Sequence, residues 1–210
     1  MNFITRFFFI IIICSSFFSC KNEAKSTVEN AVNNSKESVI VPVAEKKEIK
    51  KNELSKEVED QVNSVMLKSM VTPELKTFSS MLVTTGLVDM LSKTEGPFTV
   101  IAPSNEAFDS LDKLQMKELI NTANKDELVR LIKSHVIEGS LDSAALVQKI
   151  KEGNGSYEII SMSGTTYIAS MEDSNIVITD NKGVAAQIGK SDIKGSNGVV
   201  HVLDKVLGAN

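Results

Sequence analysis

The sequence predicts an α+β domain, and two features of its hydrophobic pattern support this prediction. Between residues 53 and 152, apolar residues recur every three or four positions among charged ones, which is typical of helices with one buried face. From Tyr157 onward, short runs rich in valine and isoleucine are separated by turn residues, as in small strands. Helices first and strands later is the order of an α+β domain.

Capping residues indicate where the expected helices begin and end. Thr72 offers a hydroxyl at the start of the second helix, and Gly86 is placed to end it. Asn124 is positioned to cap a later helix, and either Asp142 or Ser143 to cap the last one. The pattern predicts helices over 53–72, 73–85, 87–91, 114–120, 126–135 and 143–151.

The first of these helices, over residues 53–72, has two interpretations. Leu54, Val58, Val62 and Val65 recur at helical spacing with charged residues between them. The helix is expected either to pack on the domain as a leading amphipathic helix or to associate with another copy of itself. So short a run of apolar positions is not enough to indicate a coiled coil.

Residues 98–108, with the sequence FTVIAPSNEAF, hold a strand, a corner and a helix start. The apolar β-formers predict a strand inside a core. Pro103 has no N–H group, so the strand is expected to end there. Ser104 and Asn105 can each accept a hydrogen bond from the free N–H groups of a new helix, and Glu106 favours the helix N-terminus.

The later strands are expected over short β-branched runs that end in a tight turn and a final strand. Asn197 and Gly198 supply the backbone conformation of a tight turn directly before the last run. The runs are 157–162, 166–169, 176–179, 184–188 and 199–207.

Three phrases of the chain resemble the conserved boxes of the fasciclin-type (FAS1) adhesion domain. Residues 98–108 are similar to its first box, 134–139 (SHVIEG) to its central Tyr-His-Val-Val-Pro-Gly phrase, and 196–207 to its last box. The phrases occur in the family's order, and the resemblance spans residues 73–207. It implies a single fasciclin domain over residues 73–210, built as a fasciclin-like wedge of two β-sheets with helices packed along one side.

The residues before the expected helices have the composition of export and anchoring segments. Residues 1–19 combine the positive charge of Arg6 with a short apolar run, as in a signal peptide. Cys20 follows the small Ser19 and is the candidate lipid-attachment site of a bacterial lipoprotein; an ordinary secretory signal is the alternative. Residues 20–52 are rich in Lys, Glu, Asn and Ser, which predicts a flexible tether. These features indicate a lipid-anchored protein of the cell envelope, at the outer membrane, with its face undecided.

Composition and charge argue against several classes of function. The net charge is −4 and the chain has no tryptophan, which argues against nucleic-acid binding. Cys14 would leave with the signal peptide and Cys20 would carry the lipid, so neither would provide the mature domain with a disulfide or a metal-binding thiol. The sequence holds neither a Gly-rich phosphate loop nor a nucleophile elbow. We therefore expect a protein that is not an enzyme and has no cofactor and no metal site.

Two segments are candidate partner-binding sites because of the family resemblance. In some animal members, the corresponding segments are associated with integrin contact. The candidate residues here are His135, Val136, Ile137, Asp192 and Ile193.

The same residues also have a structural interpretation that needs no partner. Ser134 stands where the family phrase has a tyrosine, so a large aromatic contact is missing. His135 is expected to be buried and hydrogen-bonded, joining a helix end to the sheet, and His201 is expected to be structural or solvent-facing. Ile193 would fill the core, and Asp192 would cap a local turn.

The resemblance and the expected anchor lead to two functions. The first is adhesion or binding of an extracellular matrix ligand, through an unknown protein or glycan partner. The second is a periplasmic structural or assembly component with no adhesive role.

Overall fold

The computed structural model describes residues 55–209, so the predictions for the signal peptide, Cys20 and the tether lie outside the described residues. Residues 55–62 are helical. The later helices are α2 (Val65–Val71), η1 (Pro73–Leu75), α3 (Lys76–Thr85), α4 (Val88–Lys93), α5 (Asn105–Asp109), α6 (Lys113–Leu119), η2 (Thr122–Asn124), α7 (Lys125–Ser134) and α8 (Ser143–Glu152). The strands are β1 (Phe98–Pro103), β2 (Val136–Glu138), β3 (Ser156–Ile160), β4 (Thr166–Glu172), β5 (Asn175–Thr179), β6 (Ala185–Gly195) and β7 (Gly198–Leu203). The α+β prediction is confirmed.

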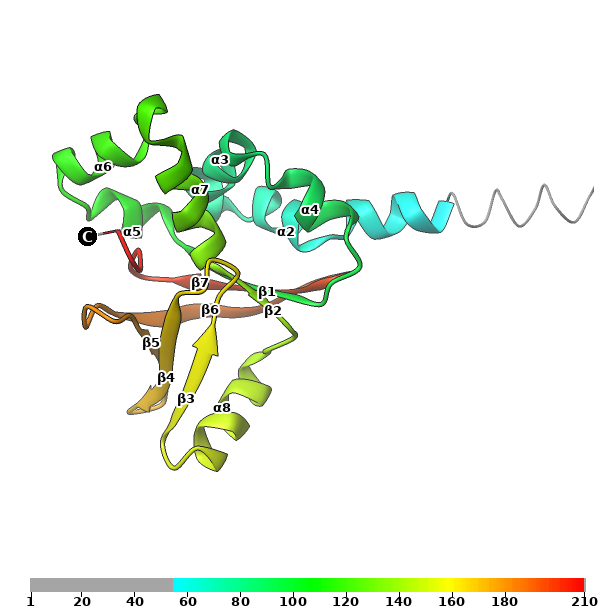
Figure 1. Ribbon diagram of the computed structural model, residues 1–210. Helices are drawn as coiled ribbons and strands as arrows, with labels where there is room; N and C mark the ends of the chain where they lie inside the picture. The colour runs from blue at the N-terminus through cyan, green and yellow to red at the C-terminus, as the bar shows by residue number, and fades with distance from the viewer. Residues whose placement is uncertain (1–54, 210) are drawn as a thin grey trace, which may run out of the picture. The chain divides into compact units, whose positions relative to one another are not determined.

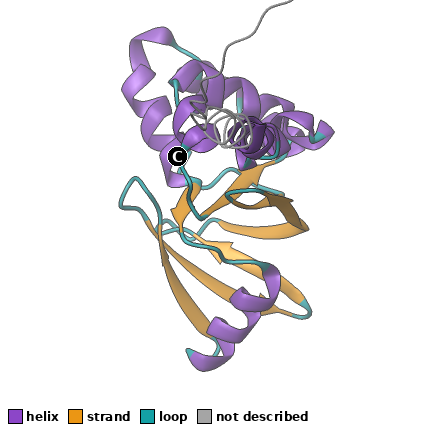
Figure 2. Ribbon diagram, turned by 90° about the vertical axis from the view of Figure 1, so that its right-hand side faces the viewer, coloured by secondary structure: helices purple, strands orange, loops and turns teal. Residues whose placement is uncertain are grey.

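The strands follow the order β2-β1-β7-β6-β5-β4-β3, in which only β1 and β7 run parallel. β6 belongs to two sheets. Its residues 185–187 pair with β5, and its residues from Ile188 to Gly195 pair with β7. Two register shifts, on either side of Lys190, separate these halves. Such irregularities bend a strand, and the two sheets diverge in Figure 2. The expected two-sheet arrangement is therefore confirmed.

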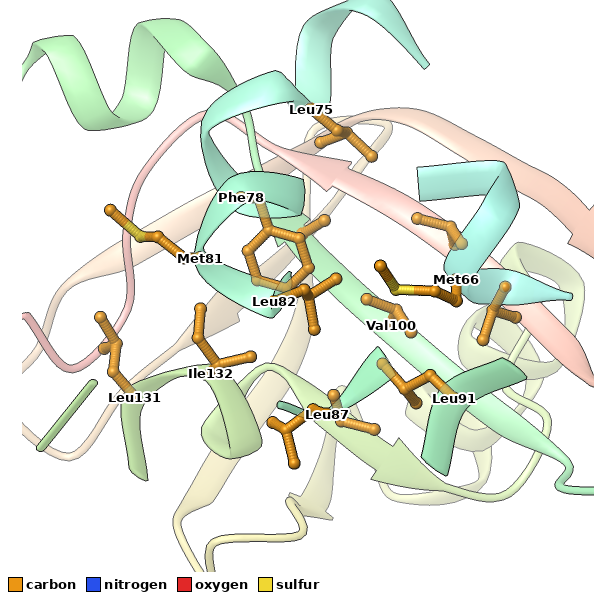
Figure 3. Packing of buried hydrophobic residues seen from close by; sticks show 14 of the residues in the cluster. Met66, Leu75, Phe78, Met81, Leu82, Leu87, Leu91, Val100, Leu131 and Ile132 are labelled. Atoms are coloured by element: carbon orange, nitrogen blue, oxygen red, sulfur yellow. The ribbon is translucent and has the colours of Figure 1, made fainter. Parts of the chain in front are cut away.

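The sheet of β1 and β7 is covered on both faces, which explains why both strands are almost entirely buried. On one face, Val100 of β1 packs among helix residues that include Phe78 and Ile132 (Figure 3). On the other face, Ile101 and Leu203 pack against the second sheet. The buried strand expected from residues 98–108 is thus a strand between two cores.

The helices are divided between the two sheets. Helices α2 to α7 lie over the sheet that contains β1 and β7, whereas α8 lies beside β3 and β4 (Figure 1). Leu146 and Ile150 of α8 are buried with residues of β3, β4 and β5. The expected row of helices along one side is therefore confirmed for α2 to α7. Helix α8 lies on the second sheet instead, because its buried apolar residues pack there.

The predicted leading helix over 53–72 is two helices in the structure. Ser64 interrupts it, and its hydroxyl accepts a hydrogen bond from Leu67 N (3.4 Å) at the start of α2. Val65 is fully buried beyond this break, whereas Val58 and Val62 before it are 54% and 51% exposed. The apolar pattern thus belongs to two different surfaces, only one of which packs on the domain.

Two predicted helix caps are wrong, because the side chains bond elsewhere. The Thr72 hydroxyl donates to the carbonyl oxygen of Lys68 (2.7 Å) and caps nothing. The Asn124 amide donates to Glu118 O, and Asn121 is the residue that caps the short η2 turn.

Other predicted caps are confirmed, with one exception in the first phrase. Ser104 Oγ accepts from Ala107 N (3.1 Å), and Asp142 accepts from Ala145 N (2.8 Å) at the start of α8. Asn105 does not cap its own helix: its amide oxygen accepts from Thr77 N (3.0 Å), which joins α5 to α3.

The Asn197-Gly198 turn joins three parts of the chain. The side chain of Asn197 accepts from Val65 N (2.9 Å) and donates to Leu91 O (3.0 Å). Gly198 has φ +150°, and a Cβ there would lie 1.9 Å from the carbonyl oxygen of Phe98. The residue must therefore be glycine for β7 to pair with β1 at this register.

Candidate functional site

The first candidate segment comprises His135, which ends α7, and Val136 and Ile137, which begin β2. The exposed fractions of His135, Val136 and Ile137 are 1%, 0% and 3%. The His135 Nδ1 atom lies 2.9 Å from the carbonyl oxygen of Leu131, so Nδ1 carries the proton. The ring meets Phe78 edge-on, with centroids 6.0 Å apart.

The environment of His135 keeps its imidazole neutral. Burial lowers the pKa of His135 to about 4, although the hydrogen bond to Leu131 opposes the shift. The Nε2 atom has no hydrogen-bond partner among residues 55–209. The prediction of a buried, hydrogen-bonded histidine is confirmed, but its bond is to its own helix and does not reach the sheet.

The second candidate segment, Asp192 and Ile193, lies in the irregular part of β6. Asp192 has φ +60° and is partly exposed, and Ile193 packs against the helix-side core. The carboxylate of Asp192 accepts hydrogen bonds from the backbone N–H (2.8 Å) and the hydroxyl of Ser143. Asp192 therefore binds the first turn of α8, and the prediction that it caps a local turn is wrong.

Hydrogen bonding from α8 determines the charge state of Asp192. Burial favours its neutral form, but the two bonds from Ser143 outweigh it and hold the pKa of Asp192 below its usual value. His201 and Lys194 lower the pKa further. Asp192 is therefore a carboxylate that fixes the position of α8 relative to β6.

His201 connects Asp192 to the segment that precedes α8. Its Nε2 lies 2.8 Å from Leu141 O, and its Nδ1 accepts from Asp192 N (3.3 Å), which fixes the proton on Nε2. Burial lowers the pKa of His201. Thr99 of β1 completes the network, because its hydroxyl accepts from Leu141 N (2.8 Å) and donates to Gly139 O (2.7 Å).

A groove lies next to the second candidate segment. The groove, about 610 Å³ in volume, runs between α8 and the end of the β4–β5 hairpin. Its lining includes Ser143, which bonds to Asp192, and Ser191, which precedes Asp192 in the chain. Val147 and Met171 contribute apolar side chains. Of the two predicted segments, Asp192 and Ile193 are partly exposed, whereas His135, Val136 and Ile137 are buried.

The structure adds Ser143, Thr99 and His201 to the candidate site. The sequence predicts Ser143 only as a cap and His201 only as structural or solvent-facing, because their shared partner Asp192 lies 49 and 9 positions away in the chain, respectively. The pairing of β6 with β7 brings His201 next to Asp192, and Ser143 joins them through its hydrogen bonds to Asp192.

The described residues contain neither a metal cluster nor a membrane-crossing helix. Within residues 55–209, no group of three or more His, Cys, Asp or Glu side chains could hold a metal ion. None of the helices in this range has the length and hydropathy required to cross a bilayer.

Comparison with protein families identifies the domain. The family model described as the fasciclin domain matches residues 73–209. This chain belongs to the fasciclin family. The three phrases at 98–108, 134–139 and 196–207 all lie within the matched region of this fasciclin domain.

The relatives of this fasciclin protein are bacterial and animal. It is 34% identical to protein sll1483 of Synechocystis over an alignment of 134 residues. This alignment covers 63% of this chain and 67% of that protein. It is 31% identical to human Stabilin-1 and 31% identical to Drosophila Fasciclin-1, over 65% and 58% of this chain. The chain spans only 5% and 18% of those two animal proteins.

A solved structure supports the same fold. A FAS1 domain pair from Fasciclin I, described as an insect cell adhesion molecule, superposes with a TM-score of 0.54. The alignment covers 69% of this chain and 50% of that one, at 19% identity.

Proposed function

We propose that this protein is a non-enzymatic, lipid-anchored component of the cell envelope that mediates adhesion or binds a matrix ligand through its fasciclin domain. The observation that carries the proposal is the family match over residues 73–209. Its relatives include Fasciclin-1, and the similar solved structure is described as a cell adhesion molecule.

The anchor is a separate part of the proposal. Cys20 follows an apolar run and a small residue, the pattern that motivates lipid attachment there. Each buried CH₂ of an acyl chain contributes about 0.8 kcal/mol, and two chains give stable attachment where one does not. The acylated protein would stay on the membrane surface, with the fasciclin domain tethered to it.

The surface beside Asp192 and Ile193 is the region we assign to partner binding. Its partial exposure and the adjoining groove support this choice. His135, Val136 and Ile137 are buried, so they would act by keeping the fold intact and not by touching a partner.

The chemistry of the described residues supports a binding role more than a catalytic one. Both histidines are buried and bonded to backbone groups. A general base must reach the proton of a substrate, and neither imidazole is accessible for that.

The anchor is tested on protein purified from its native envelope. Mass spectrometry should find an acylated Cys20 at the N-terminus, and Cys20→Ser should release the protein from the membrane fraction. An unmodified terminus, or unchanged membrane association of Cys20→Ser, contradicts the anchor.

Adhesion is tested with intact cells. Attachment to matrix polymers and to other cells should fall when the protein is absent, and added protease should cleave the tether and remove attachment. Full protection from protease together with unchanged attachment would contradict adhesion and favour a periplasmic structural or assembly role.

A further inference from the structure

A second cavity shares no lining residue with the groove beside α8. It has a volume of about 310 Å³ and lies between α6, α7, the start of β4 and residues 208–209. Hydroxyl side chains of Ser134, Thr165 and Tyr167 line it. This volume is at the lower end of the range of small-molecule sites, roughly 300–1,000 Å³.

The hydroxyl of Tyr167 is buried at this cavity without a partner. Tyr167 is fully buried and its ring packs in the second core. Among residues 55–209, no group has full hydrogen-bond geometry to its hydroxyl, and the Ser134 side chain is the one near enough to lower its pKa by hydrogen bonding. Ser134 beside it donates its own proton to Leu131 O (2.7 Å). Leaving a buried hydroxyl unpaired is unfavourable, so the site favours a ligand that can hydrogen-bond there.

The phenol stays protonated over the physiological range and is available as a donor. Burial raises the pKa of Tyr167, the Ser134 side chain opposes this, and the carboxylate of Asp180 adds to it. Asp180 is itself fixed, because its oxygens accept from Val184 N (2.9 Å) and Gly208 N (3.0 Å). These bonds fix the turn at residues 180–184 and the C-terminal residues 208–209, which together form one wall of the cavity.

The charges around the opening cancel. Glu127 pairs with Arg130, and Glu118 and Lys182 are the other two charged residues of the lining. All four are exposed, so the cavity opens to solvent. Two acids against two bases, with the negative Asp180 behind them, disfavour a charged ligand and in particular an anion.

The lining also has an apolar part. Leu119 and Leu131 contribute methyl groups, and Ala209, near the C-terminus, contributes another. Such a mixture suits a molecule with C–H faces and many hydroxyls, each of which can donate and accept. A neutral sugar has this chemistry and this size.

We propose that the cavity binds one neutral sugar unit of a glycan, with the Tyr167 hydroxyl as its innermost hydrogen-bond partner. The inference goes beyond the proposed function, because it adds a second binding site apart from the surface beside Asp192 and Ile193. It rests on the proposed function only for its biological role.

The first experiment measures binding to the full chain by calorimetry. The probes are methyl glycosides of galactose, mannose and N-acetylglucosamine, with galacturonate as the charged counterpart of galactose. At least one neutral probe should bind saturably, with a dissociation constant roughly in the millimolar range for a molecule of this size. Galacturonate should bind at least several-fold more weakly than galactose.

Tyrosine fluorescence locates the binding. The chain has two tyrosines and no tryptophan, so Tyr157→Phe leaves Tyr167 as its single fluorophore of this kind. The emission of this variant should change with the same dissociation constant that calorimetry gives.

Three variants separate the cavity from the rest of the surface. Tyr167→Phe removes one oxygen and should weaken binding roughly tenfold. Ser134→Tyr introduces the tyrosine of the family's central phrase at the cavity and should abolish binding. Ser80→Tyr makes the same replacement on the exposed face of α3, at a residue that lines neither this cavity nor the groove beside α8, and should leave affinity within twofold.

The outcomes distinguish this inference from the proposed function. No saturable binding of any neutral probe, tighter binding of galacturonate, or unchanged affinity of Tyr167→Phe overturns the sugar site, even if cells still attach. Sugar binding that Tyr167→Phe weakens supports the site, even if the envelope protein proves to have no role in attachment. Should Ser134→Tyr fail to fold, Tyr167→Phe still decides the question.

Discussion

His135 shows how a single buried residue makes the domain sensitive to acid. In the folded protein its pKa is about 4, whereas the ordinary value in an unfolded chain is 6.5. Between these two values the unfolded chain binds a proton that the folded protein does not. The free energy of unfolding therefore decreases as the pH falls through this window.

We predict a loss of about 3 kcal/mol from this residue between pH 6.5 and pH 4, because each pKa unit corresponds to about 1.4 kcal/mol. Urea unfolding followed by circular dichroism at several pH values measures it. His135→Gln keeps a side-chain donor near Leu131 but cannot titrate. Its stability should fall less steeply over the same window. The remainder is due to His201, whose pKa burial also lowers, and towards pH 4 to Asp192 and Glu74, whose pKa values are lowered too. Equal slopes for the variant and the parent would contradict the assignment.

At the scale of the element, α8 depends on two aspartates from different parts of the chain. Asp142 is its own N-cap, and Asp192 reaches it from β6 through Ser143. Negative charge near a helix N-terminus is favourable, and a carboxylate bond is stronger than a neutral one. β6 therefore both pairs with β7 and orients the helix that covers the second core.

We predict that the hydroxyl of Ser143 and the carboxylate of Asp192 are coupled by about 1–2 kcal/mol in a double-mutant cycle of Ser143→Ala and Asp192→Ala. The strain of an alanine at the positive φ of position 192 occurs in both backgrounds and cancels. Urea unfolding gives the four free energies.

The matched control combines Ser143→Ala with Asp112→Ala. Asp112 caps α6 by accepting from Leu114 N and Gln115 N, whereas Ser143 belongs to α8, so this pair should be additive within roughly 0.5 kcal/mol. A coupling between Ser143 and Asp192 no larger than the control would contradict the proposed connection.

At the scale of the whole molecule, the core begins before the region that defines the family. The family model starts at residue 73, but Val65 and Met66 of α2 are 0% and 2% exposed in the helix-side core. Val65 N also donates to Asn197, which precedes the last strand. Helix α2 is therefore part of the folding unit.

We predict that a chain beginning at residue 73 is less stable than one beginning at residue 63 by roughly 3–6 kcal/mol, the contribution of two buried apolar side chains. This is a large share of the typical stability of a domain, about 5–15 kcal/mol. Removal of residues 55–62 alone should cost much less, because residues 55–60 are exposed. Thermal and urea unfolding are measured for the full chain and for the chains that begin at residues 63 and 73. Equal stability of the last two would show that α2 is dispensable.

The parts of the fold that could be predicted from the sequence depend on neighbours in the chain. Ser104 and Asp142 were identifiable as caps because a cap bonds to an N–H three residues away. The helices and most strands follow from hydrophobic periods that also act over a few residues. The sequence alone therefore determined the α+β class, the buried strand after Pro97 and the three phrases by which the family is recognised.

Only the tertiary structure decided which distant groups these residues meet. Asn105, Asn197 and Asp192 have side chains that could serve a local turn, but they bond to residues 28, 132 and 49 positions away, respectively. Residues 189–195 lack the alternation of a strand and became one because β7 offered paired backbone groups. The hydroxyl of Tyr167 likewise reaches its cavity only because β4 packs next to α7. Hydrogen bonds and burial between segments far apart in the chain depend on how those segments pack, which no local pattern encodes.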